Sequence, residues 1–156
     1  MRVFRFVIII IYLMSLSQVN AVNITGSNTI NSDSSTQQVY NADETSLTIT
    51  NSSTLSRTGQ APVNINGQDD ATLTINSGSS ITATSHNTVQ GRNQDGLTVT
   101  NSGTISSGGS KAINLLNAQN STVTNNSGGI IKSNTNTVTL TEDGGTGNNV
   151  TITNSG

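Results

Sequence analysis

An internal repeat of about 25 residues limits the folds that are open to this chain. Triplets of the form Asn-Ser-Gly or Asn-Ser-Ser are separated by 25, 25, 25 and 28 residues, and they begin at Asn51, Asn76, Asn101, Asn126 and Asn154. A fixed period of this length is typical of solenoids and other repeat architectures. We therefore expect a stack of similar units.

Apolar residues follow the same period in three sets. One set precedes the triplets: Ile24, Ile49, Ile75, Val99, Val123 and Ile152. A second set follows them: Ile30, Leu55, Ile81, Ile105 and Ile130. The third comprises Val63, Thr88, Ile113 and Val138, with Ile65, Gln90, Leu115 and Leu140 as companions. Because Thr88 is polar, we expect Val89 to replace it through a shift of one residue.

Within each unit, apolar residues alternate with Thr or Asn, as in residues 47–50 and 97–100. This period of two indicates short strands with one buried face. Each unit has room for three strands, the first before the triplet, the second around Leu55 and the third around Val63. The sequence therefore predicts an all-β, right-handed parallel β-helix (β-solenoid), with about 25 residues and three short strands per rung and about five rungs. Asn and Thr at equal phase are expected to form side-chain ladders along the stack.

Residues 1–21 have the features of a secretory signal peptide. Arg2 and Arg5 precede an apolar run over residues 6–16, and a polar segment ends at Ala21. The run is shorter than the roughly 20 residues that a membrane-spanning helix needs. We expect cleavage between Ala21 and Val22, export by the Sec pathway, and a mature solenoid over residues 22–156 with no membrane span.

Composition excludes a nucleic-acid binder. Asn, Ser and Thr number 22, 22 and 25 of 156 residues, and only 9% of residues are charged. Beyond the signal peptide, four cations face eight carboxylates, and the cations Arg57, Arg92, Lys111 and Lys132 do not share one phase. Phosphate contacts require clustered Lys and Arg. The chain has no cysteine, so disulfides and thiolate metal sites are excluded as well.

The carboxylates recur at one phase of the repeat and form a predicted acidic corner row. Its members are Glu44, Asp69, Asp70, Asp95 and Asp143, with Asn120 between the last two. One hypothesis is a Ca²⁺-binding or carbohydrate-facing ridge, since Ca²⁺ prefers carboxylate and carbonyl oxygens. The other is that Asp and Asn serve tight corners by bonding to the backbone. We favour the second, because no calcium-loop motif is present, and we predict no metal or cofactor site.

We predict no catalytic residues. Ser85 and His86 could be combined with Asp69 or Asp95 on adjacent rungs, but such triads are defined by geometry, and no Gly-x-Ser-x-Gly motif is present. His86 is expected to be a solvated corner residue, and Tyr40 to pack near the N-terminal end of the solenoid. The glycine pair at 108–109 and the run at 144–147 are expected to be turns that use positive φ.

Residues 97–106, Leu-Thr-Val-Thr-Asn-Ser-Gly-Thr-Ile-Ser, are followed by Ala-Ile-Asn-Leu at 112–115. This pattern resembles the passenger repeats of bacterial autotransporters, which fold as right-handed parallel β-helices on the cell surface. The resemblance extends over the mature chain and implies Sec export, passage through the outer membrane, and a role in adhesion or as a stalk. It also implies a C-terminal translocator barrel, which this sequence does not contain, so we expect a passenger segment truncated at its C-terminus.

The predicted function is that of a surface-displayed or secreted adhesin or stalk segment, not an enzyme, at the cell surface, outer membrane or outside the cell. Its expected partners are a ligand on a host or matrix surface, the secretion machinery and, at full length, a translocator barrel. Two alternatives stay open. One is a fragment of a parallel β-helix polysaccharide lyase or hydrolase, and the other is a disordered Ser/Thr/Asn-rich secreted segment.

Overall fold

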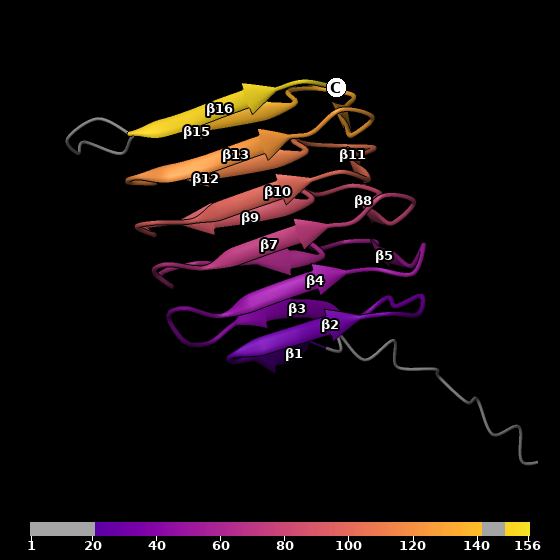
Figure 1. Cartoon of the computed structure of the whole chain (residues 1–156), viewed down its shortest axis with the longest axis horizontal. Coiled ribbons are helices and arrows are strands. Elements are labelled where there is room, and N and C mark those ends of the chain that lie inside the picture. The colour runs from indigo at the N-terminus through magenta and orange to yellow at the C-terminus, as the bar shows by residue number, and fades with distance from the viewer. Residues whose placement is uncertain (1–20, 142–148) are drawn as a thin grey trace, which may run out of the picture.

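The computed structural model describes residues 21–141 and 149–156, which form strands and turns without any helix. The chain winds as a coil in which each turn lies above the preceding one (Figure 1). All strand pairs are parallel, and they build three sheets along the coil axis. This architecture is the β-solenoid that the sequence predicts. None of its described segments is a helix long and apolar enough to cross a membrane.

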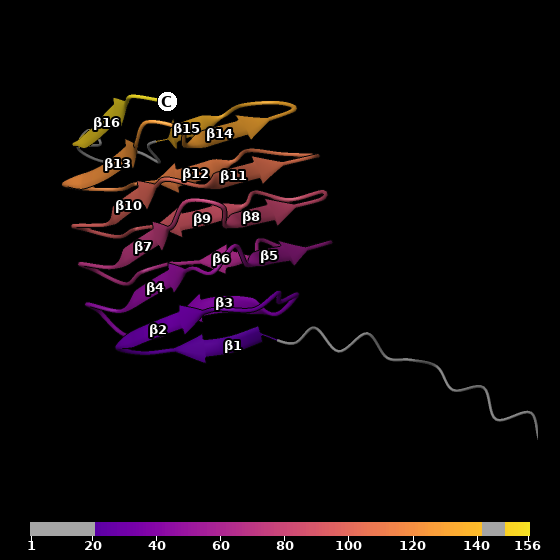
Figure 2. The same cartoon turned by 45° about the vertical axis from the view of Figure 1, so that its right-hand side comes forward.

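Each sheet takes one strand from each turn (Figure 2). Sheet A contains β1 (Ala21–Ile24), β3 (Gln37–Tyr40), β6 (Val63–Asn64), β9 (Val89–Arg92), β12 (Ile113–Leu116) and β15 (Val138–Thr141). Sheet B contains β2 (Ser27–Ile30), β4 (Ser46–Ile49), β7 (Thr72–Ile75), β10 (Thr98–Asn101), β13 (Ser121–Asn125) and β16 (Val150–Asn154). Sheet C contains β5 (Thr54–Arg57), β8 (Ser80–Ala83), β11 (Thr104–Ser107) and β14 (Ile130–Ser133).

The coil makes about four turns, fewer than the five predicted. Each complete turn runs through sheets B, C and A in that order, from β4 to β15. Strands β1, β2 and β3 precede the first complete turn. There, residues 33–35 contact β5 of sheet C through a bridge between Ser34 and Leu55 and through hydrogen bonds that Thr54 and Arg57 donate to Asp33 and Ser35. Strand β16 pairs on β13 beyond the fourth turn.

The core is a set of aliphatic columns inside the coil. In sheet B, Leu47, Leu73, Val99 and Val123 lie above one another in direct register, and all four are fully buried. In sheet C, the column comprises Leu55, Ile81, Ile105 and Ile131. Stacking lets each apolar layer cover the next, which an isolated turn could not do.

Val89 takes the inward place in sheet A, as predicted. It pairs with Val63 on one side and Ile113 on the other, and it is fully buried, so the third apolar set continues through this turn. The shift places Gly91, and not the predicted Gln90, opposite Leu115. A Cβ at Gly91 would lie 2.7 Å from Nε2 of Gln94, whose buried side chain fills the space above the glycine.

The first predicted apolar set is divided between two inward columns of sheet B, because Ile49 and Ile75 pair onward with Asn101, whereas Val99, Val123 and Ile152 continue the column of Leu73. Three further residues of the predicted sets occupy other places. Ile24 pairs with Tyr40 in sheet A, so it does not share a column with Ile49. Ile30 lies in sheet B, where it pairs with Ile49. Ile130 is 49% exposed, because the register of β14 on β11 brings Ile131 into the core instead. These errors arise because the corners differ in length, which a constant 25-residue step ignores.

Candidate functional surface

The Asn-Ser-Gly triplets do not keep one structural phase. Asn76 is an exposed corner residue, whereas Asn101 points into the coil and is fully buried. The inward column is continued by Asn125 and Asn154, so Asn125 takes the place that the triplet pattern gave to Asn126. The reason is a short corner between β10 and β11, where Ser102 and Gly103 replace the four residues that the neighbouring turns use.

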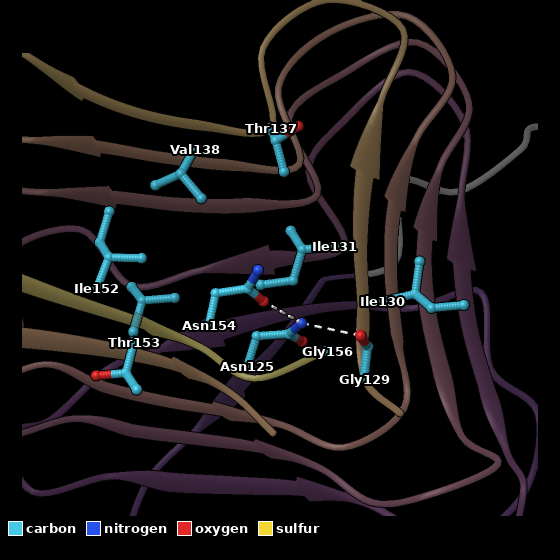
Figure 3. A pocket seen from close by; sticks show the side chains of 11 residues that line it. Asn125, Gly129, Ile130, Ile131, Thr137, Val138, Ile152, Thr153, Asn154 and Gly156 are labelled. Atoms are coloured by element: carbon cyan, nitrogen blue, oxygen red, sulfur yellow. Dashed lines mark hydrogen bonds between the residues drawn. The ribbon is translucent and has the colours of Figure 1, made fainter. Parts of the chain in front are cut away.

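The inward asparagines form a hydrogen-bonded ladder, as expected for side chains at equal phase. The Nδ2 of Asn101 donates to Oδ1 of Asn125 at 2.7 Å, and Nδ2 of Asn125 donates to Oδ1 of Asn154 at 2.8 Å. Asn125 also donates to the carbonyl oxygen of Gly129 at 2.8 Å, and both contacts are drawn in Figure 3. The buried amides are thereby satisfied by one another and by the backbone, as buried polar groups require.

The same ladder borders a hollow of about 390 Å³ at the last turn (Figure 3). Its lining includes Val123, Ile131, Val138 and Ile152, which belong to the inward columns of sheets A, B and C. The hollow is therefore the uppermost layer of the coil interior, where Ile152 is 49% exposed. Among the described residues, its lining contains no carboxylate side chain, histidine or lysine, and its hydroxyls are those of Thr137 and Thr153.

The predicted acidic corner row is divided between two adjacent columns at the corner from sheet A to sheet B. Asp69 and Asp95 lie in one column, where the backbone N–H of Asp95 donates to Oδ1 of Asp69 at 2.8 Å. Glu44 and Asp70 occupy the neighbouring position, and both have positive φ, 56° and 52°. Asp143 lies outside the described residues.

Asp43 begins the column of Asp69 and Asp95, although it was not among the predicted members of the acidic row. Its Oδ1 accepts the backbone N–H of Asp69 at 2.9 Å. At the upper end, Nδ2 of Asn120 donates to Oδ1 of Asp95 at 2.9 Å, and Nδ2 of Asn149 donates to Oδ1 of Asn120 at 2.9 Å. The steps of 26 residues from Asp43 to Asp69 and from Asp69 to Asp95 were the signal that could have identified it.

The contacts of the acidic row favour the structural hypothesis. The described carboxylates of Asp43, Asp69 and Asp95 accept hydrogen bonds from the next turn, so they hold the corners in register. No group of three or more His, Asp or Glu suited to hold a metal ion occurs in the described part of the chain. His86 is exposed at the corner between sheets C and A, one corner away from Asp69 and Asp95.

Tyr40 packs in the core near the N-terminal end of the coil, as predicted, and is only 2% exposed. Its hydroxyl donates to the backbone carbonyl of Thr72 at 2.8 Å. Burial raises the pKa of the phenol well above its ordinary value, and a backbone hydrogen bond at Leu47 opposes this effect. Tyr40 is therefore a neutral structural residue and offers no aromatic surface to a ligand.

The cations do not form a basic stripe. Arg57 is buried and donates through Nη1 to the carbonyl oxygen of Ser35 at 3.0 Å. Arg92 and Lys132 are exposed, but they lie on different sheets, A and C.

Gly108 and Gly109 do not have the predicted positive φ. Their conformation is ordinary, but a Cβ on Gly108 would approach the carbonyl oxygen of Thr84 to 2.7 Å, so close contact with the turn below requires glycine.

The outer face of sheet B consists only of hydroxyl side chains, in two columns that run along the coil. One column is Ser27, Ser46, Thr72, Thr98, Thr122 and Thr151, and the other is Thr29, Thr48, Thr74, Thr100, Thr124 and Thr153. We call these twelve residues the threonine face. All of them are partly or fully exposed. The register is direct at every step, so the columns are straight and regular.

The outer faces of the other two sheets are different. In sheet C the hydroxyls bond to one another along the axis: Ser80 donates to Oγ1 of Thr54 at 3.1 Å, and Thr82 and Ser106 lie 3.0 Å apart. A shallow polar groove of about 480 Å³ crosses this face near Lys132. In sheet A the column is mixed, with Asn64, Gln90, Asn114 and Thr139 in sequence. The threonine face is the most regular surface of the coil.

Comparisons with protein-family models, with curated proteins and with solved structures find no match to this chain. The candidate function is therefore argued from the geometry of the coil and its surfaces.

Proposed function

We propose that this chain is an exported, surface-displayed segment of a bacterial adhesin, in which the β-helix acts as a stalk and contact surface without catalysis. The resemblance of residues 97–106 to autotransporter passenger repeats motivates the class. Its ligand is a component of a host or matrix surface, and its route is the Sec pathway, followed by a translocator barrel in the full-length product. The finding that carries the proposal is the coil itself, whose sheet B keeps one register through six strands.

A coil of this kind suits a stalk for a physical reason. Each turn contacts only its neighbours, so the rod lengthens by adding turns without changing the core of the existing ones. Parallel strand pairs hold every turn to the next by backbone hydrogen bonds, and the inward columns continue through the stack. The outward residues are mostly uncharged hydroxyls and amides, which gives each face a repeated chemistry along its length.

The use of the carboxylates supports a role without catalysis. Asp43 and Asp69 are occupied by backbone N–H groups of the next turn, so their oxygens stabilise corners. A polysaccharide lyase or hydrolase would need acids gathered in a cleft, and none of the described residues that line the hollow beside Ile131 and Ile152 is an acid. The ordered coil also disagrees with the alternative of a disordered secreted segment.

The predicted cleavage site is compatible with the fold. Residues 1–20 lie outside the described part of the chain, and Ala21 is the first residue of β1. Cleavage after Ala21 would leave Val22–Ile24 in register with Gln38–Tyr40. Removal of the signal peptide would therefore retain three of the four residue pairs between β1 and β3.

Export is tested by expressing the epitope-tagged chain in a Gram-negative host and measuring the mass of the protein in each cell fraction. We expect a product outside the cytoplasm that begins at Val22. Ile9→Asp, in the apolar run, is the matched control and should leave the full-length chain in the cytoplasm. An uncleaved, cytoplasmic product from the unaltered chain would contradict the proposal.

The contact role is tested separately, with beads that carry the purified chain. We expect them to bind host-cell or matrix-coated surfaces more than beads that carry an unrelated protein. The same preparation should release no unsaturated sugars from polygalacturonate in the presence of Ca²⁺. Cleavage that is lost in Asp69→Asn would establish the enzymatic alternative instead.

A further inference from the structure

The threonine face is a two-dimensional lattice. Neighbouring strands of a sheet lie about 4.8 Å apart, and alternate residues of one strand about 6.6 Å apart. Six strands of sheet B repeat these spacings without a shift of register, from Ser27 and Thr29 at one end to Thr151 and Thr153 at the other. A ligand that uses the whole face must itself repeat in two dimensions.

The hydroxyls of this lattice are directed to solvent. In sheet C, Thr82 bonds to Ser106 through its hydroxyl. By contrast, within the described residues the hydroxyl groups of Thr74, Thr100 and Thr124, and of the other members of the threonine face, make no hydrogen bond to protein. Threonine is also stiff at χ1 because it is β-branched. The face therefore presents equivalent, ordered hydroxyl and methyl groups that need partners from outside the protein.

The chemistry of the face excludes the usual macromolecular ligands. It contains no charged residue, so it has nothing to pair with phosphate or carboxylate groups. It contains none of the Trp, Tyr or Arg side chains that dominate protein interfaces. It also has no aromatic ring on which a sugar could stack, because Tyr40 is buried. What remains is hydrogen bonding to a regular array of small donors and acceptors.

We propose that the threonine face binds the surface of ice. Water molecules in an ice crystal are arranged in rows whose spacings are of the same size as those between the threonine columns and rungs. Water held between the hydroxyls of Thr74 and Thr100 would take the spacing of the protein lattice, with the methyl groups filling the gaps. The inference concerns this face alone and does not depend on export or display of the chain.

Many equivalent contacts explain why the array matters more than any one residue. A single hydroxyl gains little by exchanging liquid water for ice, because it is hydrogen bonded in both cases. Twelve groups held rigidly in register lose little further entropy when they meet a matching crystal plane. A bulky charge in the centre of the face should therefore disrupt binding far beyond its own site.

The test is the growth of a single ice crystal in a solution of the purified chain, measured by nanolitre osmometry. We expect faceted crystals and a gap between melting and growth temperatures that widens with protein concentration. Thr100→Lys, in the centre of the threonine face, should abolish both effects. Thr48→Lys, two turns away on the same face, should do so as well. Thr82→Lys, at an outward position in sheet C, is the matched control and should retain both.

Far-UV circular dichroism of each variant separates loss of binding from loss of the fold. Round crystals and no temperature gap with the unaltered, folded chain would overturn the proposal. Equal loss in folded Thr82→Lys and Thr100→Lys would also overturn it, because binding would then not belong to the threonine face. Pull-down of the chain by crystalline cellulose or chitin, lost in Thr100→Lys, would assign the face to a polysaccharide instead.

Discussion

One inward column of sheet B contains two different types of side chain. In the N-terminal turns, which are the lower ones in Figure 1, it consists of Ile30, Ile49 and Ile75, and in the C-terminal, upper turns it consists of Asn101, Asn125 and Asn154. The column is continuous, because Asn101 pairs directly with Ile75. The same place in the coil can thus be filled either by stacked aliphatic side chains or by amides that satisfy one another.

The difference extends to the following corner. The residue before each sheet C strand is Ser53 or Ser79 in the lower turns and Gly103 or Gly129 in the upper turns. Glycine is needed beside asparagine, because a Cβ at Gly129 would lie 2.5 Å from Oδ1 of Asn125. At Gly103 a Cβ would instead meet the carbonyl oxygens of Ser79 and Asn76 in the turn below, so both upper corners require glycine, but only Gly129 does so because of the asparagine column.

The largest expected effect is at Val99, where the two halves of the sheet meet. Val99→Asp places a charge without a partner between Leu73 and Val123 and should destabilise the coil by more than about 4 kcal/mol. Thr98→Asp, on the outward side of the same strand, should change stability by less than about 0.5 kcal/mol. Urea unfolding followed by circular dichroism gives both values. Equal effects would show that the assignment of inward and outward residues is wrong.

An amide in the lower, aliphatic half of this inward column should destabilise the coil. Ile49→Asn removes a buried aliphatic side chain and places an amide between Ile30 and Ile75, neither of which can bond to it. We expect a loss of about 2–4 kcal/mol in the free energy of unfolding. A loss below about 1 kcal/mol would mean that the two halves of the column are interchangeable.

Loss of the asparagine ladder in the upper half of the column should destabilise the coil less than Ile49→Asn does. Asn125→Ala removes the acceptor of Asn101 and the donor to Asn154, and should cost about 1–3 kcal/mol. Asn126→Ala is the matched control, since among the described residues its Nδ2 bonds to Oγ of Ser102 alone, at the surface corner. Urea midpoints of the two variants should differ clearly. Coincident midpoints would show that the buried amides contribute no more than a surface contact.

The smallest effect concerns Tyr40, at the lower end of the coil. Tyr40→Phe loses the hydrogen bond to Thr72 and should cost about 1 kcal/mol near neutral pH. The raised pKa of the buried phenol means that the unfolded chain releases this proton first, above pH of about 10. The contribution of Tyr40 to stability should therefore be constant below that pH and fall as pH rises above it. Thermal melts between neutral and alkaline pH check this, and an equal fall in Tyr40→Phe would contradict it.

The sequence alone predicted the architecture because its two periods have separate physical origins. Alternation in residues 47–50 reflects the two faces of a strand, and the 25-residue step reflects one turn of the coil. The same step failed at Ile24 and Ile130, where corner length shifts the register. The change from Ile75 to Asn101 was not predicted either, because a buried asparagine has the same sequence letter as a corner asparagine.

The candidate surfaces were predicted in part. The described members of the predicted acidic row lie at one corner of the coil, but Asp43 was missed and Glu44 belongs to the adjacent column. The threonine face was present in the sequence as repeated Thr-x-Thr, as in residues 72–74 and 98–100. Its meaning required the structure, because alternation alone does not reveal that, among the described residues, the hydroxyls of the threonine face are without protein partners while Thr82 and Ser106 in sheet C bond to each other.

The register of sheet B is the basis of both the core columns and the threonine face, and a disulfide test measures it directly. The chain has no cysteine, so a pair can be introduced without background. Thr74 and Thr100 are register partners, and Cα atoms on paired strands lie about 4.8 Å apart, within the roughly 4.4–6.8 Å that a disulfide needs. Thr74 and Thr98 are offset by two residues, about 8 Å apart, which is too far.

Mild oxidation of the double variant Thr74→Cys with Thr100→Cys, followed by mass spectrometry of a digest, should give an intramolecular disulfide in high yield. The pair Thr74→Cys with Thr98→Cys should remain reduced under the same conditions. A disulfide in the second pair and not in the first would contradict the register, and with it the stacked columns on both sides of sheet B.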